Sequence, residues 1–267
     1  MKIFPDTVEI ITNFIKSRVA DAESEGVVLG LSGGLDSAAT LSLAVSALGS
    51  EKVTGLIMPF HVTESVDLAN NHAKSLGVNT VTININDIVS SYKKSSDLYS
   101  EKLSEGNLHS RIRMSLLYGY GFSSNRLVVG TSNKSELLIG YYTKWGDGGT
   151  DFLPIGDLYK SQIFNLGESL GIPSEILTRK PTAELWPEQT DEADLGFTYL
   201  ELDKVLYELE RFSAVDKISN KIGISIKKIA KIQGLIRLSI HKRVFPPVCK
   251  IGLRTVGLDW RETIGTK

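Results

Sequence analysis

The segment of this sequence best suited to chemistry is rich in glycine and contains a carboxylate near its end. It reads GLSGGLDS, Gly30–Ser37, and lies between the apolar run Val27–Leu29 and a run of good helix formers. A turn from strand to helix directs backbone N–H groups and the positive end of the helix dipole at one point, which favours a bound phosphate. The segment lacks the lysine of the common triphosphate loop. Asp36 could instead bind Mg²⁺ beside that phosphate, although an Asp here is also a frequent helix cap.

A second acidic residue stands at the same kind of junction. Glu136 follows the apolar run Leu127–Gly130 through the polar segment Thr131–Ser135. It could complete a metal site with Asp36. The alternative is a first-turn Glu that the helix dipole favours.

Strands and helices must alternate to position these residues. Apolar runs predict strands at about 27–31, 53–59, 80–85 and 127–130, with helix-forming segments between them. This alternation predicts an α/β fold, an open, doubly wound, mostly parallel sheet with helices on both faces. Ligands of such sheets bind at the carboxyl ends of the strands, where both acidic segments lie. Further helices are expected near 158–170, 199–212 and 226–240, within one domain over 1–267 that is helical from about 197 to 245.

The composition is that of an ordinary globular protein. The chain has 267 residues, of which 42% are hydrophobic and 23% charged. Lys+Arg total 30 and Asp+Glu total 31, so no excess of positive charge predicts a nucleic-acid partner. The single cysteine, Cys249, excludes an internal disulfide and fits a reducing cytoplasm. No stretch approaches the ~18 apolar residues of a membrane span, so we expect a cytoplasmic protein with no membrane partner.

A polar stretch from about 180 to 195 interrupts the helical part. It holds two prolines and five acidic residues and is too long for a simple turn. A mobile lid over the site and a plain surface loop are both consistent with it.

Several segments together resemble a known family. SGGLDS is similar to the pyrophosphatase-type loop of ATP-dependent amide and thio ligases, which several families share. The segments GTSNKSE (130–136), YTKWGDGGTD (142–151) and HKR (241–243) then follow in the order found in the NAD synthetase family. The second of these is the most specific, because no turn rule requires that string. The resemblance runs from the first strand almost to the C-terminus and is nearest to archaeal-type, ammonia-dependent members.

The resemblance implies a role for each matching residue. ATP would contact Gly30, Leu31, Ser32, Gly33, Gly34, Leu35, Asp36, Ser37, Thr131, Lys160 and Thr182. Mg²⁺ would be bound by Asp36 and Glu136, and Asp36 and Lys160 would be the catalytic residues. Deamido-NAD would contact Arg111, Lys144, Asp151, His241 and Lys242. Positive side chains suit its diphosphate and carboxylate, and Lys160 suits the charge on a migrating phosphoryl group.

The activity implied is the synthesis of NAD from deamido-NAD, ATP and ammonia. ATP would adenylate the nicotinate carboxylate with release of pyrophosphate, and ammonia would then displace AMP. The resemblance also implies a homodimer with deamido-NAD across its interface. Two alternatives remain, an RNA-modifying ligase with the same loop and an ATP-sensing module. Near-neutral charge and one cysteine disfavour the first, and the second leaves Lys144, Asp151 and His241 without a task.

Overall fold

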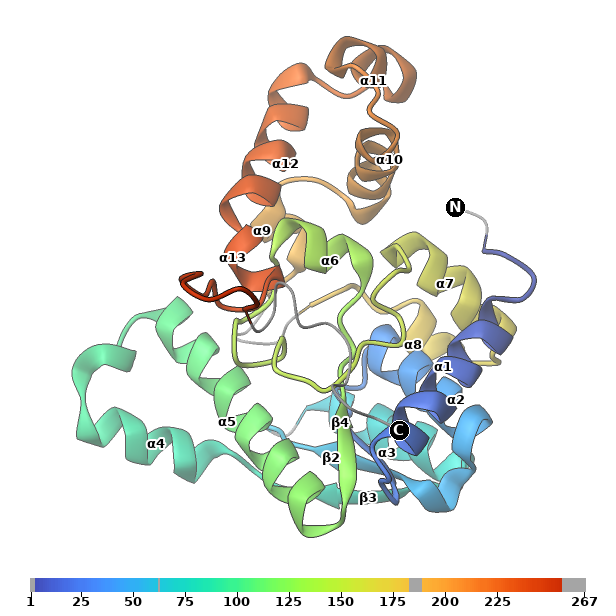
Figure 1. Cartoon of the computed structure of the whole chain (residues 1–267). Coiled ribbons are helices and arrows are strands. Elements are labelled where there is room, and N and C mark those ends of the chain that lie inside the picture. Colours follow the sequence, from blue (N-terminus) through green and yellow to red (C-terminus); the bar gives the residue numbers. More distant parts are fainter. Residues whose placement is uncertain (1–2, 62, 183–188, 256–267) are drawn as a thin grey trace.

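Four parallel strands form the sheet around which the chain is organised (Figure 1). The strands are β1 (Gly26–Gly30), β2 (Val53–Ile57), β3 (Asn79–Thr82) and β4 (Arg126–Val129), in the order β3-β2-β1-β4. The computed structural model describes residues 3–61, 63–182 and 189–255. β1 pairs with β2 on one side and with β4 on the other. Since β1 and β4 are parallel neighbours, their carboxyl ends are adjacent. The expected α/β fold class is confirmed.

The third strand is shorter than the sequence predicts. It ends at Thr82 because the chain turns at Asn84, whose side-chain oxygen accepts a 2.8 Å hydrogen bond from the N–H of Asn86 at the start of the next helix. The first two strands and the fourth match their expected positions within two residues.

Helices cover both faces of the sheet because successive strand residues point in opposite directions. Val27 and Leu29 of β1 face a core shared with α1, α2 and α3, whereas Val28 faces a core shared with α4 and α5. These helices are α1 (Thr7–Asp21), α2 (Leu35–Leu48), α3 (Glu64–Ser75), α4 (Asn86–Ser95) and α5 (Lys102–Ser123). Two short 3-10 turns lie at Ser50–Lys52 and Asp97–Tyr99.

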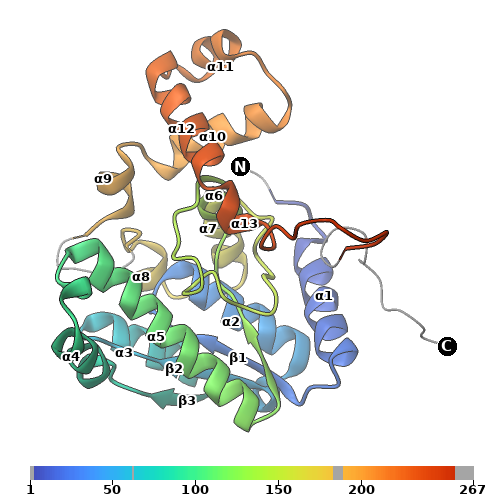
Figure 2. The same ribbon diagram turned by 60° about the vertical axis from the view of Figure 1, so that its left-hand side comes forward.

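The C-terminal half is helical and has a core of its own. Its helices are α6 (Lys134–Ile139), α7 (Lys160–Ser169), α8 (Ser174–Leu177), α9 (Asp191–Leu195), α10 (Tyr199–Glu210), α11 (Val215–Ile222), α12 (Ile226–Leu238) and α13 (Ile240–Arg243). Both views place α10, α11 and α12 beyond α6, on the side away from the sheet (Figures 1 and 2). In the described part of the chain no helix is long and apolar enough to cross a membrane.

Candidate active site

The glycine-rich segment forms the turn from β1 into α2. Gly33 has a φ of +76°, and a Cβ there would lie 2.3 Å from the carbonyl oxygen of Ser65, so only glycine fits. The backbone N–H groups of Ser32 and Gly34 donate to the hydroxyls of Ser37 and Ser32, at 3.3 and 3.2 Å. N–H groups and hydroxyls thus converge at the N-terminus of α2, which is the arrangement that binds a phosphate.

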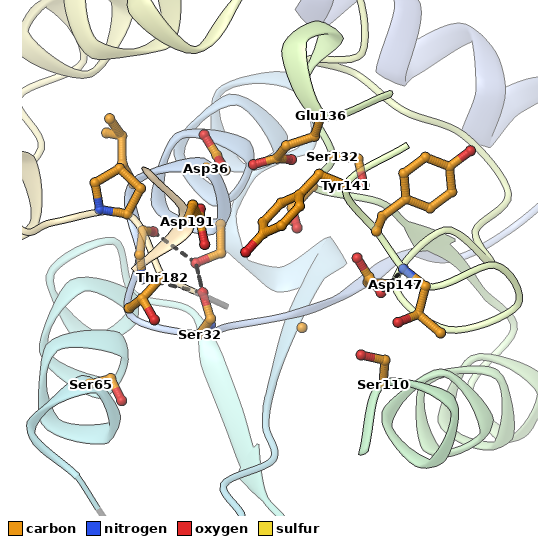
Figure 3. Close-up of a pocket in the computed structure, with 18 of the residues that line it drawn as sticks. Ser32, Asp36, Ser65, Ser110, Ser132, Glu136, Tyr141, Asp147, Thr182 and Asp191 are labelled. Carbon is orange, nitrogen blue, oxygen red and sulfur yellow. Dashed lines mark hydrogen bonds between the residues drawn. The ribbon is translucent and has the colours of Figure 1, made fainter. Parts of the chain in front are cut away.

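Three charged residues predicted to act together do lie together. Asp36 is in the first turn of α2, Glu136 in the first turn of α6, and Lys160 is the first residue of α7. The Lys160 ammonium forms an ion pair with Asp36 Oδ2 and lies 3.8 Å from Glu136 Oε1. Asn133 donates to Asp36 at 3.3 Å and forms the capping box of α6 with Glu136. Figure 3 shows Asp36 and Glu136 on one side of the cavity, near Asp191.

Burial and neighbouring charges set the protonation of this group. Burial raises the pKa of Glu136, and the charge of Asp36 raises it further. Burial alone would lower the pKa of Lys160, but the carboxylates of Asp36 and Glu136 outweigh it and raise that pKa above its ordinary value. The positive form of Lys160 is therefore favoured by the acidic residues beside it.

Two further residues at this site were not assigned a role from the sequence. The Tyr199 hydroxyl donates to Asp191 Oδ2 at 3.0 Å and lies 3.4 Å from Glu136 Oε1. Asp191 is buried, and burial raises its pKa. Sequence reasoning did not single out Asp191, because its contact with Tyr199 depends on how α9 (Asp191–Leu195) packs against α10.

The donor set fits Mg²⁺, which prefers one or two carboxylates completed by phosphate oxygens and water. Asp36 Oδ1 is buried and has no hydrogen-bond partner among the described residues, so it is free to bind a hard cation. Within the part of the chain that the structure describes, no three or more His, Cys, Asp or Glu side chains are grouped so that they could hold a metal ion. Asp36 and Glu136 would therefore need the phosphates of a nucleotide to complete the coordination.

The turn at Ser32–Ser37 is called the phosphate turn. A cavity of about 1660 Å³ opens in front of it. Figure 3 shows it from Ser65 and Thr182 at one end to Ser110 and Asp147 at the other. Thr131 also lines it, as expected for a residue that contacts ATP. Of the expected lid at about 180–195, the flanking segments 180–182 and 189–194 line the cavity in part, and 183–188 lie outside the described residues.

The residues expected to hold deamido-NAD fall into two groups. Lys242 lines the cavity and donates to the carbonyl oxygens of Gly140 and Tyr142 at 2.7 and 2.6 Å. Asp151 is not among the residues that line the cavity; it accepts from the Val128 N–H at 2.7 Å and from the Tyr118 hydroxyl at 3.0 Å, so it anchors its loop to β4.

The other three form a chain of contacts that does not line the cavity. Arg111 donates to the Lys144 carbonyl oxygen at 3.4 Å, and the Lys144 ammonium donates to the His241 carbonyl oxygen at 2.7 Å. Arg111 is in α5, Lys144 is in the loop that follows α6, and His241 is in α13. The structure thus brings these three together, beside the cavity.

The specific YTKWGDGGTD segment is a tightly folded loop. Its Asp147 accepts the Thr143 N–H at 2.9 Å, and partial loss of hydration around the carboxylate raises the pKa of Asp147. A Cβ at Gly146 would lie 2.8 Å from Ser110 Cβ, and one at Gly148 would lie 2.5 Å from the Tyr142 ring. Close packing against α5 therefore explains Gly146, and close packing within the loop explains Gly148.

A parallel sheet with a phosphate turn, paired carboxylates and a lysine at adjacent strand ends is typical of nucleotide-binding α/β proteins. The chain belongs to the NAD synthase family, whose model matches residues 7–246. A curated relative from Archaeoglobus fulgidus, named NH(3)-dependent NAD(+) synthetase, is 48% identical over 251 residues, 93% of this chain and 98% of the relative. A relative of the same name from Thermococcus sibiricus is 44% identical over 245 residues, 90% of this chain and 96% of the relative.

Solved structures agree with this family. An NMN synthetase from Francisella tularensis superposes with a TM-score of 0.82 at 33% identity, covering 92% of this chain and 98% of that one. The NH3-dependent NAD synthetase from Campylobacter jejuni in complex with the nitrate ion gives 0.78 at 34% identity, with the same coverage. The expected family and enzyme class, an ammonia-dependent NAD synthetase, are confirmed.

Proposed function

We propose that this chain forms the amide of NAD from deamido-NAD and ammonia, and that ATP is cleaved to AMP and pyrophosphate. The relatives support the overall reaction. The observation that carries the chemistry is the ion pair between Lys160 and Asp36, beside the phosphate turn and within reach of Glu136. A site with this charge arrangement stabilises a transferring phosphoryl group rather than merely holding a nucleotide.

Adenylation explains why ATP is needed. A carboxylate does not react with ammonia, because oxide is a very poor leaving group. In the proposed first step a nicotinate oxygen attacks the α-phosphorus, and pyrophosphate leaves into the turn at Ser32–Ser37. Ammonia then attacks the carbonyl carbon, and the C–O bond breaks to release AMP with the former carboxylate oxygen. The Lys160 ammonium would offset the charge that develops on the phosphoryl oxygens.

Mg²⁺ is proposed as the metal that accompanies ATP. Asp36 and Glu136 would hold it; Oδ1 of Asp36 is buried and has no hydrogen-bond partner within residues 3–61, 63–182 and 189–255, so it could bind the ion. Bound there, the ion would neutralise phosphate charge and favour loss of pyrophosphate.

A homodimer is proposed to complete the deamido-NAD site. Arg111, Tyr118 and Phe122 lie on one face of α5, at spacings of seven and four residues. The Phe122 side chain is 93% exposed. A large exposed aromatic on the same helix face as an arginine is typical of a surface that another chain covers. A second copy on this face would bring Arg111, Lys144 and His241 to deamido-NAD.

We also propose that residues 1–267 act as one domain in the cytoplasm, with about 180–195 as a lid and without a nucleic-acid partner. The near balance of 30 basic and 31 acidic residues supports the last point. The cavity-lining segments 180–182 and 189–194 support the lid, because water at the adenylate would hydrolyse it.

One assay tests this function. The purified chain is mixed with Mg–ATP, ammonium and deamido-NAD, and AMP, pyrophosphate and NAD are measured. We expect the three products in equal amounts, little NAD with glutamine in place of ammonium, and a weaker reaction with nicotinate mononucleotide. The reaction with the mononucleotide is informative because the similar structure from Francisella tularensis is that of an NMN synthetase. Pyrophosphate release that requires RNA, or ATP binding without turnover, would contradict the proposal.

A further inference from the structure

One face of α10 carries polar side chains to the helices that hold the catalytic residues. Tyr199, Asp203 and Glu210 are spaced by four and seven residues, so they project from the same side of the helix. Leu202, Val205 and Leu206 instead pack in the apolar core of the C-terminal helices. α10 contacts both α6 and α7, the helices that begin with Lys134 and Lys160.

Asp203 is the central residue of this polar face. It is fully buried, yet each of its carboxylate oxygens has a donor. Oδ1 accepts the Ser135 hydroxyl at 2.5 Å, and Oδ2 accepts the backbone N–H of Ser161 at 2.8 Å. Ser135 precedes Glu136, and Ser161 follows Lys160. One carboxylate on α10 therefore joins the helix of the acidic residue to the helix of the lysine.

Ser135 connects Asp203 to the backbone of Lys160 by two hydrogen bonds. A serine hydroxyl has one hydrogen, and here that hydrogen is donated to Asp203. Its lone pairs therefore face the backbone N–H of Lys160, which donates to Ser135 Oγ at 2.9 Å. The first N–H groups of a helix have no partner within the helix. At α7 the first two are bound by Ser135 and by Asp203, so the backbone from which the Lys160 side chain extends is fixed.

Two other contacts of α10 hold the same helix starts. Glu210 accepts from the Lys134 ammonium at 2.9 Å and from the Tyr159 hydroxyl at 2.7 Å. Lys134 opens α6, and Tyr159 precedes α7. Two residues of α10, Asp203 and Glu210, therefore fix the position of α6 relative to α7.

We propose that Asp203 is a positioning residue that places the Lys160 ammonium against Asp36 and Glu136, and so sets the rate of the adenylation step. The inference rests on the proposed function in one respect, namely that Lys160 offsets the charge on the phosphoryl oxygens. A carboxylate suits the position because it accepts at both oxygens, whereas the amide of Asn would turn a donor toward Ser135 or Ser161. Burying a charge is costly and is tolerated when such hydrogen bonds satisfy it.

The first test replaces this carboxylate. Asp203→Asn is expected to lower kcat at least about tenfold, since small misplacements of catalytic groups have such effects, with KM for ATP changed less than about twofold. Ser135→Ala should act in the same direction. The matched control is Glu208→Gln on the same helix, because Glu208 pairs with Lys221 and Ser213, away from α6 and α7. The control is expected to keep kcat.

The second test separates positioning from general loss of stability. In a Lys160→Ala background, Asp203→Asn should lower kcat no further, because the group it positions is gone. A further loss of the same size there would overturn the inference, as would unchanged kcat in Asp203→Asn alone. If Asp203→Asn does not fold, Ser135→Ala is used in the same comparison with the same criteria. Full kcat in Lys160→Ala would instead contradict the proposed task of Lys160, so the two failures are distinguishable.

Discussion

Lys160 and Asp36 lie 124 residues apart in the sequence, and their side chains form an ion pair at the mouth of the phosphate turn. Both are largely buried, with 12% and 15% of the side chain exposed. Parallel strands bring the two helix starts together, because β1 leads into α2 and β4 leads toward α6 and α7. The pair is thus a direct consequence of the fold.

This pair predicts a split between kcat and KM. Lys160→Ala should lower kcat by about 100-fold or more, because loss of one group that stabilises charge in the transition state has an effect of that size. KM for ATP should change little. Steady-state kinetics with saturating ammonium measure both constants. Lys221→Ala is the control, because Lys221 pairs with Glu208, away from α6 and α7. An effect confined to KM for ATP would count against the role given to Lys160.

The phosphate turn should tolerate no side chain at Gly33. Gly33→Ala combines a positive φ with a Cβ 2.3 Å from the Ser65 carbonyl oxygen, so the turn must open and ATP binding should be lost. Gly223→Ala is the matched control, because Gly223 has the same φ of +76° and no atom of the described residues lies within 4 Å of the added Cβ. The control should cost about 1–2 kcal/mol of stability without loss of ATP affinity. Calorimetric titration with ATP tests this, and equal affinities in the two variants would refute it.

Charge reversal at Arg111 should affect one substrate only. Arg111→Glu should raise KM for deamido-NAD about 10- to 100-fold, the size of a lost charge-assisted hydrogen bond, and leave KM for ATP nearly unchanged. Arg211→Glu, exposed on the C-terminal helices, is the control. Light scattering on the same samples should give a mass twice the 29.3 kDa of one chain. A fully active monomer would disprove the shared site.

His109 predicts a loss of stability at acid pH. Burial, and secondarily the charge of Arg113, lowers the pKa of His109 from 6.5 to about 4. Between these values the unfolded chain binds a proton that the folded chain does not, so stability falls as pH is lowered from about 6.5 to about 4, by up to about 3 kcal/mol. His109→Gln should flatten this part of the curve in urea unfolding. His72, whose pKa burial also lowers, retains part of the slope.

A matched substitution checks that origin. His241→Gln, at an exposed residue of α13, should leave the pH dependence of stability as it is in the unchanged chain. A slope that is the same in His109→Gln and in His241→Gln would mean that His109 is not its source.

The sequence predicted the sheet and the positions of Asp36 and Glu136 because both depend on local signals. Alternating apolar runs predict parallel strands, and a polar turn before a helix marks a strand's carboxyl end. The contacts of Asp203 could not be predicted in this way. The helix around it was expected, but which of its residues face α6 and α7 depends on packing between segments 42 and 68 residues apart. The cluster of Arg111, Lys144 and His241 is likewise formed by tertiary contacts.

The central claim is that the nicotinate carboxylate is adenylated, and the fate of its oxygens tests this most directly. Deamido-NAD labelled in that carboxylate with a heavy oxygen isotope is converted to NAD with Mg–ATP and ammonium, and the products are analysed by mass spectrometry. Attack on the α-phosphorus followed by C–O cleavage predicts one labelled oxygen in each AMP and none in pyrophosphate. AMP without label, or label in inorganic phosphate formed together with ADP, would contradict the mechanism.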